Sequence, residues 1–71
     1  MSVVKIVELI GQSDNNWPEA AENALKEAHK TIRNITGLDI VGWTAEVKDG
    51  KITKYKVNVK VAFIVERGQA N

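Results

Sequence analysis

The side chains of this 71-residue chain that could do chemistry are mainly charged, and one set of them forms a basic run near the end of the chain. The set consists of Lys48, Lys51, Lys54, Lys56 and Lys60. Lysines are point-charge partners for phosphate, so copies gathered around a symmetry axis would form an anion site. The alternative is the solvated face of a strand, on which lysines prevent pairing with other chains. We favour this second interpretation for the run as a whole.

Catalytic groups are scarce in the sequence. There is no cysteine and no glycine-rich phosphate loop, and the single histidine, His29, has no evident nucleophile beside it. The sequence Gly11-x-Ser13 lacks the second glycine of a nucleophile elbow. A lone histidine without a second His or Cys nearby is also a poor metal site. We therefore expect a protein that is not an enzyme.

Carboxylates offer another kind of chemistry, the binding of a cation. Asp39, Glu46 and Asp49 lie in or beside expected strands. Calcium takes roughly six to eight oxygen ligands, and no segment has the spacing of an EF-hand loop. A calcium site would therefore need carboxylates from several subunits that converge on a symmetry axis.

The overall charge argues against two classes of partner. Lys and Arg number 10 against 9 for Asp and Glu, so no net field attracts nucleic acid or an anionic membrane. The lysine-rich face also lacks the aromatic residues that stack on bases. No apolar run is long enough to span a bilayer, and the first residues do not form a signal peptide. We expect a cytoplasmic protein without nucleic-acid or membrane partners.

The hydrophobic pattern predicts the elements that must position these side chains, in one domain spanning residues 1–71. The expected elements are a strand over residues 3–10, a turn over 11–15, a helix from 16 to about 34 or 35, and strands over 38–47 and 52–65. Asn16 is the expected N-cap and Gly37 the expected end of the helix. Gly42 predicts a bend or bulge, and Asp49-Gly50 a type I′ hairpin. The fold class is α+β, with the order β-α-β-β and a three-stranded antiparallel sheet curled around one helix.

The last expected strand, residues 52–65, indicates an oligomer. Its side chains alternate between apolar and polar over roughly 45 Å, and one helix cannot cover a ribbon of that length. A chain of this size buries only about 60% of its unfolded surface, and without cysteines it has no disulfides to stabilise it. Association with further copies of the chain is the remaining source of stability.

Three stretches together carry a family resemblance. They read Val4-x-Ile6-Val7-Glu8-Leu9-Ile10-Gly11-x-Ser13, Glu19-Ala20-x-x-Asn23-Ala24-Leu25-x-x-Ala28-x-x-Thr31-Ile32, and Asp49-Gly50-Lys51-Ile52-x-x-Tyr55-x-Val57-x-Val59-x-Val61-x-Phe63. With the element order, they resemble the dodecin family over nearly the whole chain. Dodecins are small β-α-β-β proteins that assemble as twelve subunits into a hollow shell, and several of them bind flavins. The resemblance implies a homododecamer with a small-molecule or ion ligand.

The chain departs from the flavin-binding dodecins at the flavin site. Those proteins carry Trp-Phe-Glu-Val at the start of the second strand, and the Trp stacks on the isoalloxazine ring. Gly37-Leu38-Asp39-Ile40 stands there in this chain, and a glycine has no π-face. The flavin-contacting Gln of the last strand is Lys56, and the family's Arg-Gly is Thr44-Ala45. The resemblance is therefore to the branch without the stacking Trp, some members of which bind calcium.

We expect the ligand site to lie between subunits, around Gly37, Asp39, Trp43 and Lys56. Trp43 and Gly37 are both odd-numbered, so they are expected on one strand face, about 20 Å apart. At that distance Trp43 could reach only the ligand site of another subunit. The alternative for Trp43 is an aromatic residue buried at a subunit interface. We expect Trp17 to be a packing residue. The expected function is to bind or sequester a small ligand. The family resemblance implies a flavin-type ligand, but we expect flavin binding by this chain to be weak or absent. The alternative is a structural or calcium-binding dodecamer without flavin.

Overall fold

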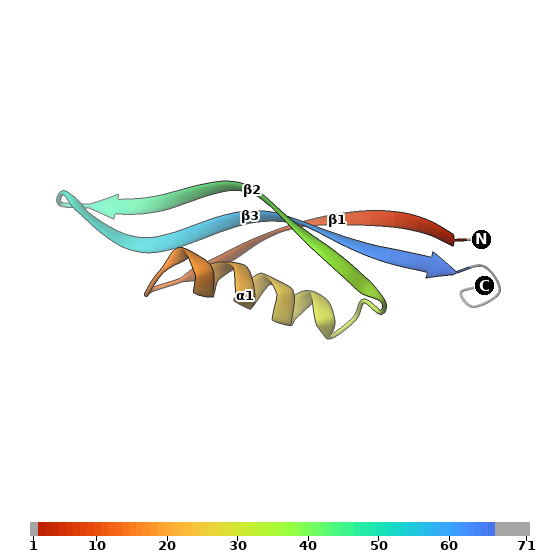
Figure 1. Cartoon of the computed structure of the whole chain (residues 1–71). Coiled ribbons are helices and arrows are strands. Elements are labelled where there is room, and N and C mark those ends of the chain that lie inside the picture. The colour runs from red at the N-terminus through yellow and green to blue at the C-terminus, as the bar shows by residue number, and fades with distance from the viewer. Residues whose placement is uncertain (1, 67–71) are drawn as a thin grey trace.

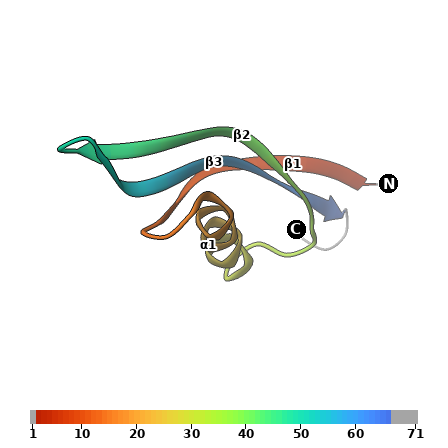
Figure 2. The same cartoon turned by 60° about the vertical axis from the view of Figure 1, so that its left-hand side comes forward.

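The computed structural model describes residues 2–66 and contains one helix and three strands (Figure 1). The elements are β1 (Ser2–Ser13), α1 (Trp17–His29), β2 (Ile35–Lys48) and β3 (Lys51–Glu66). All neighbouring strands are antiparallel in the order β1-β3-β2, and α1 lies on one face of the curved sheet (Figure 2). The predicted β-α-β-β fold is confirmed.

The N-terminus of α1 is capped as the sequence predicts, but the helix is shorter. The Asn16 side chain accepts a hydrogen bond of 2.7 Å from the backbone N–H of Glu19, and the helix begins at Trp17. The predicted end near residue 34 or 35 is wrong, because α1 ends at His29. Asn34 has a φ of 62°, a left-handed conformation that reverses the chain direction. Gly37 is therefore not a cap; it lies in β2.

The strands are longer than predicted at both ends of the sheet. β1 continues through Gly11 to Ser13, so only the end of the predicted turn over residues 11–15 lies outside the strand. The Asp49-Gly50 turn is as predicted: its φ values are 54° and 76°, the two positive angles of a type I′ hairpin.

The core is a small contact surface between α1 and the middle of the sheet. It consists of Ala20, Ala24, Ala28, Val57, Val59 and Val61, all buried. Gly11 of β1 lies directly beneath the helix: a Cβ there would stand 1.9 Å from the Ala20 carbonyl oxygen. Small residues on both sides thus let the helix and the sheet approach closely, as the alanine-rich helix requires.

Cross-strand pairs identify the two faces of the sheet. Val57, Val59 and Val61 face α1, so their partners across the ladder share that face, which we call the helix face. The alternate residues of β3, and their partners, form the outer face. Bulges interrupt the β2–β3 ladder between Ile35 and Gly37, between Ile40 and Gly42, and between Glu46 and Val47. Each bulge changes which residues of β2 point to a given face.

The helix leaves much of the sheet uncovered. It packs on β1 and β3 and barely contacts β2, and the hairpin continues beyond the end of β1 (Figure 1). We call this free part, residues 46–54, the hairpin arm. The molecule measures 53 × 19 × 15 Å with a radius of gyration of 14.6 Å, against about 11 Å for a compact chain of this length. Its surface of 5262 Å² also exceeds the roughly 4400 Å² expected of a compact monomer.

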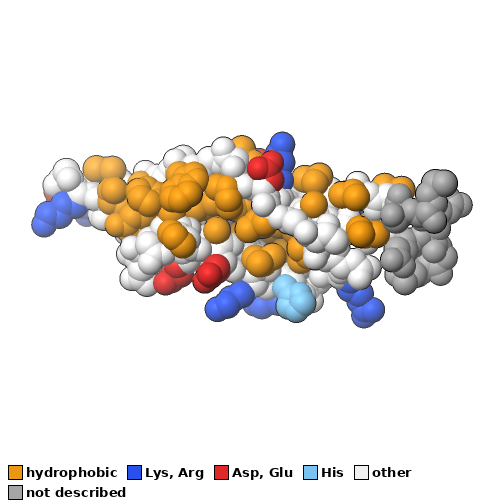
Figure 3. Space-filling view, viewed as in Figure 1, with side chains coloured by type: hydrophobic (Ala, Val, Ile, Leu, Met, Phe, Trp, Pro, Cys, Tyr) orange, Lys and Arg blue, Asp and Glu red, His pale blue; other side chains and the backbone are white. Residues whose placement is uncertain are grey.

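Apolar side chains occupy much of this uncovered surface. They form a band above α1 that extends from the hairpin arm to the middle of the molecule (Figure 3). The large exposed apolar residues are Val3, Val4, Ile6, Ile10, Ile40, Val41, Trp43, Val47 and Ile52. Large exposed apolar surfaces on a soluble protein are typical of protein–protein interaction sites, so this surface favours association with further copies of the chain. Among residues 2–66, no helix has the length and apolar character needed to cross a membrane.

Candidate ligand site

Three of the four residues expected at the ligand site lie on the outer face. Gly37 pairs with Ala62, Asp39 with Lys60, and Lys56 with Thr44. Ala62 and Lys56 are six residues apart along β3, or roughly 20 Å, so Gly37 and Lys56 do not meet within one subunit. A pocket that uses both must combine residues from different subunits.

Trp43 lies on the opposite face from the other three. It pairs with the buried Val57, and therefore points to the helix face. The prediction that Trp43 shares a strand face with Gly37 is wrong, because the bulge between Ile40 and Gly42 adds one residue and reverses the alternation. Gly42 is the sequence signal for this bulge, which moves the residues after it to the opposite face.

Trp43 instead belongs to an aromatic cluster with Trp17 and Tyr55. The Trp17 ring centroid lies 5.6 Å from that of Trp43 and 4.7 Å from that of Tyr55, the latter in an edge-to-face arrangement. The Trp17 Nε1–H donates a hydrogen bond of 2.8 Å to the backbone oxygen of Thr44, which ties the helix to β2. The expected packing role of Trp17 is thus observed, whereas Trp43 remains 58% exposed in the subunit.

Gly37 leaves an open position on the outer face. A Cβ built there would meet only the Cβ of Ala62, at 3.9 Å, which is an ordinary van der Waals distance. The backbone of Gly37 is not in the left-handed region, so other residues fit its conformation. Gly37 therefore carries no aromatic ring, and within the subunit a side chain could start from this position without a clash at its Cβ.

Lys56 is engaged within its own subunit. Its Nζ atom lies 2.8 Å from Oε2 of Glu46, and this hydrogen bond lowers the pKa of the Glu46 carboxyl. Lys54 is similarly placed 3.6 Å from Asp14. Two members of the lysine run are therefore partnered by carboxylates, one in β2 and one in the turn after β1, in agreement with the solvated-face interpretation.

Charged side chains also form a row across the outer face. Glu8 of β1 and Asp39 of β2 are the two cross-strand partners of Lys60 in the central strand. Among residues 2–66, no three side chains of the types that bind metals gather in one subunit. The row brings two carboxylates per subunit to one level of the sheet, and a calcium site would need more from neighbouring copies.

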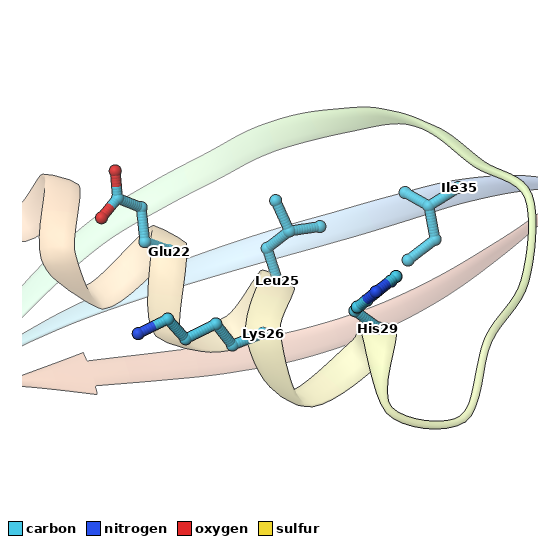
Figure 4. A pocket seen from close by; sticks show the side chains of 5 residues that line it. All are labelled: Glu22, Leu25, Lys26, His29 and Ile35. Atoms are coloured by element: carbon cyan, nitrogen blue, oxygen red, sulfur yellow. The ribbon is translucent and has the colours of Figure 1, made fainter.

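Within residues 2–66, a polar and an apolar hollow lie beside the helix. A polar one of about 330 Å³ lies at the β1–α1 turn, where Glu19 accepts hydrogen bonds from Asn15 and from Ser13 that lower its pKa. An apolar one of about 470 Å³ lies between α1 and the start of β2 (Figure 4). His29 lines this second hollow at the helix surface, with no metal-binding side chains gathered around it among the described residues.

The fold defines a class of small β-α-β-β proteins with a three-stranded antiparallel sheet and one helix. The chain belongs to the dodecin family: the family model described as Dodecin matches residues 3–66. Two relatives are similar over almost their whole lengths. The calcium dodecin of Mycobacterium tuberculosis is 31% identical over 70 residues, which are 97% of each chain. The dodecin of Thermus thermophilus is 30% identical over 64 residues, which are 90% of this chain and 93% of the relative.

Solved structures agree with this assignment. A crystal structure of a variant of the T. thermophilus dodecin has a TM-score of 0.89 at 28% identity, covering 94% of this chain and 100% of that chain. The structure of the M. tuberculosis calcium dodecin, described as having a novel calcium-binding site, has a TM-score of 0.79 at 27% identity. It covers 97% of this chain and 99% of that chain. Family membership implies the dodecameric assembly predicted from the sequence.

Proposed function

We propose that this chain forms a homododecameric shell that binds and sequesters a small ligand without turning it over. The observation that carries this proposal is the uncovered apolar surface of the single subunit. A helix of 13 residues lies against a sheet whose central strand has 16, and the apolar residues left exposed lie on both faces. Association covers this surface, and the family relationship supplies the number of subunits.

The ligand pocket in this proposal is assembled between subunits. Gly37, Asp39 and Lys56 contribute from the outer face, and Trp43 contributes from a different copy because it faces the other way in its own. A planar or phosphorylated molecule suits this combination of an aromatic ring, a lysine and open backbone. Lys56 would exchange its partner Glu46 for the ligand, at a cost in binding free energy.

Flavin binding is proposed to be weak or absent. Gly37 provides no ring where the flavin-binding members carry Trp, and Lys56 cannot reproduce the paired donor and acceptor of an amide. These two departures support the proposal that the chain is one of the dodecins that lack the stacking Trp. Because the position of Gly37 is open rather than blocked, the missing ring is the main defect, and Gly37→Trp should restore stacking.

The experiment is a fluorescence-quenching titration of lumichrome, riboflavin and FMN against the purified oligomer in calcium-free buffer. We expect no quenching by the wild type and quenching by Gly37→Trp. Gly42→Trp is the matched control, since Gly42 pairs with Asn58 on the same outer face and has nothing within 4 Å of its Cβ position. Strong quenching by the wild type would contradict the proposed weak binding. A 7.8 kDa monomer by native mass spectrometry at micromolar concentration would contradict the shell itself.

Calcium is the second candidate ligand, and the relationship to a calcium dodecin favours it. Asp39 and Glu8, in the outer-face row, are the carboxylates that several subunits could bring together. A specific site would raise the melting temperature with calcium over that with chelator, because a ligand that binds only the folded state stabilises it. Asp39→Asn should abolish the difference, and Asp49→Asn, in the hairpin turn, should leave it unchanged. An equal melting temperature with calcium and with chelator would exclude this function.

A further inference from the structure

Asn58, in the middle of β3, carries a buried polar atom without a partner. Its side chain lies on the outer face, between Ile10 of β1 and Gly42 of β2. The Oδ1 atom is almost inaccessible to solvent and has no hydrogen-bond partner among the described residues. A buried acceptor without a partner is unfavourable, and folded proteins keep few of them. Because no hydrogen bond holds this oxygen inside, rotation about χ2 can turn either the oxygen or the amide nitrogen of Asn58 outward.

The surface beside Asn58 is open. Gly42 is its cross-strand partner in β2, and a Cβ built on Gly42 would meet nothing within 4 Å. Ile10, its partner in β1, is 65% exposed and offers an apolar contact. The bulge between Ile40 and Gly42 brings the glycine opposite Asn58, and bulges are frequent beside functional sites. We call the exposed backbone at Gly42 the glycine shelf, because a planar molecule can lie on it with one edge against the amide.

A carboxylate lies one step along the same face. Asp39 is the cross-strand partner of Lys60, which follows Asn58 by two residues, so Asp39 and Asn58 are diagonal neighbours at roughly 7–8 Å. Asp39 is exposed and forms no ion pair within residues 2–66, not even with Lys60. Glu8, the other partner of Lys60, leaves this row with a net negative charge. The shelf is therefore bordered by an acceptor and by an amide that can present a donor or an acceptor.

These groups define the hydrogen-bonding edge that a ligand must present. An exocyclic amino group can donate to Asp39, and the ring nitrogen next to it can pair with Asn58, whose amide turns to match a donor or an acceptor. Aminopurines and aminopyrimidines have such an edge. The flavin ring system instead presents a carbonyl oxygen on each side of its N–H, and a carbonyl oxygen placed against a carboxylate is repulsive. This discrimination against flavins is independent of the missing ring at Gly37.

We propose that the outer-face pocket binds a planar nitrogen heterocycle with an exocyclic amino group, held by Asn58 and Asp39 on the glycine shelf. This inference rests on the proposed function, for which it names the class of ligand, and it adds Asn58 to the binding residues. The ligand supplies a partner for an amide whose orientation the subunit itself does not fix.

Matched pairs of neutral nucleosides test the requirement for the amino group. Guanosine and inosine differ only in that group, and so do adenosine and purine riboside. In isothermal titration calorimetry with the wild-type oligomer, we expect the amino member of each pair to bind at least roughly tenfold more tightly, because its hydrogen bond has a charged acceptor. Equal affinities within either pair, or no binding by any of the four nucleosides, would overturn the inference.

The carboxylate is tested by a change that keeps its shape. Asp39→Asn removes the charge, so the preference for the amino member of each pair should fall by roughly tenfold. Asp49→Asn is the matched control, since it makes the same change in the hairpin turn and should keep the full preference. A preference that survives Asp39→Asn, or that is lost in the control as well, would contradict the assigned role of Asp39.

Asn58→Leu separates a binding role from a structural one. We expect this variant to lose affinity for guanosine and adenosine, and to melt roughly 4–8 °C above the wild type without ligand, because an unpartnered buried acceptor is replaced by an apolar group of similar size. An amide that served only the fold would give a lower melting temperature. That result, or an unchanged affinity, would contradict the binding role.

Native mass spectrometry distinguishes failure of this inference from failure of the proposed function. A wild-type dodecamer that binds none of the four nucleosides would remove the amino heterocycle as ligand and leave the shell standing. A monomeric wild type would remove the shell, and with it the pocket between subunits on which this inference rests.

Discussion

Replacing Gly11 by alanine is expected to be among the most damaging single-methyl changes in this chain. The new Cβ would lie 1.9 Å from the Ala20 carbonyl oxygen and 2.9 Å from the Cβ of Ala24. Neither atom can rotate away, because one is helix backbone and the other is attached directly to it. The helix must therefore move off the sheet by more than about 1 Å before the contact with Ala20 reaches 3.0 Å.

The loss of stability can be judged from the gap that this movement would open between the helix and the sheet. All three buried alanines of α1 contact the same sheet surface, and a gap of about 0.5–1 Å forfeits a quarter to a half of a van der Waals contact. Overpacking usually costs about 1–3 kcal/mol, and a clash with backbone belongs at or above the upper end. We expect a loss of about 3 kcal/mol per subunit, which lowers the melting temperature by roughly 12–24 °C for a domain of this size.

The assay is thermal unfolding by circular dichroism, with wild type and variant at equal subunit concentration because assembly makes the midpoint concentration-dependent. Gly42→Ala is the matched control: its Cβ meets nothing within 4 Å, so the variant should match the wild type or be slightly more stable. If Gly11→Ala melts within a few degrees of Gly42→Ala, the close approach of helix and sheet does not limit stability, and the reasoning fails.

Three further changes have defined expected outcomes. Gly50→Ala should cost about 1–2 kcal/mol in chemical denaturation, because the φ of 76° is left-handed; an unchanged midpoint would contradict a rigid type I′ turn. Trp17→Phe should cost about 0.5–1.5 kcal/mol, because it removes the donor to Thr44 and keeps a ring; a loss no larger than that of a surface substitution would show that the bond contributes nothing. Asn15→Ala should raise the pKa of Glu19, which the Asn15 side chain lowers most strongly, measured by NMR titration. Because the pKa of Glu19 is lowered on folding, its stabilisation is complete above the ordinary pKa and is lost as the pH falls through the lowered value. The variant should therefore lose less stability on acidification than the wild type.

The sequence predicted the order and type of every element because each one has a local signal. The alternation of β3, the cap at Asn16 and the turn at Asp49-Gly50 depend on residues close together in the chain, and the structure confirms all three. The end of the helix was predicted wrongly because Ile32 and Ile35 continue the apolar spacing. Both pack against the core, but from a connecting segment and from β2 instead of from the helix.

The candidate site was less predictable because it depends on bulges and on other subunits. The residue types at Gly37, Asp39 and Lys56 led to the prediction of a ligand site without a stacking ring, and the register places all three residues on one face. The face on which Trp43 lies depends on an inserted residue in β2. Gly42 indicates that a bulge is present, but the sequence alone does not say which strand carries the extra residue. The contact of Trp17 with Trp43 joins residues 26 positions apart, and no local pattern could have revealed it.

The bulge between Ile40 and Gly42 has a consequence for comparing members of this family. It acts as a single-residue insertion in β2, so adding or removing one residue there would exchange the two faces for the rest of the strand without altering any side chain. Sequence alignment places residues in columns by similarity, and a column does not record which face a residue occupies. Two relatives that differ at this bulge would align Trp43 with a residue on the opposite side of the sheet. Functional residues beyond Gly42 are therefore best transferred between relatives by cross-strand pairing with β3, and not by column.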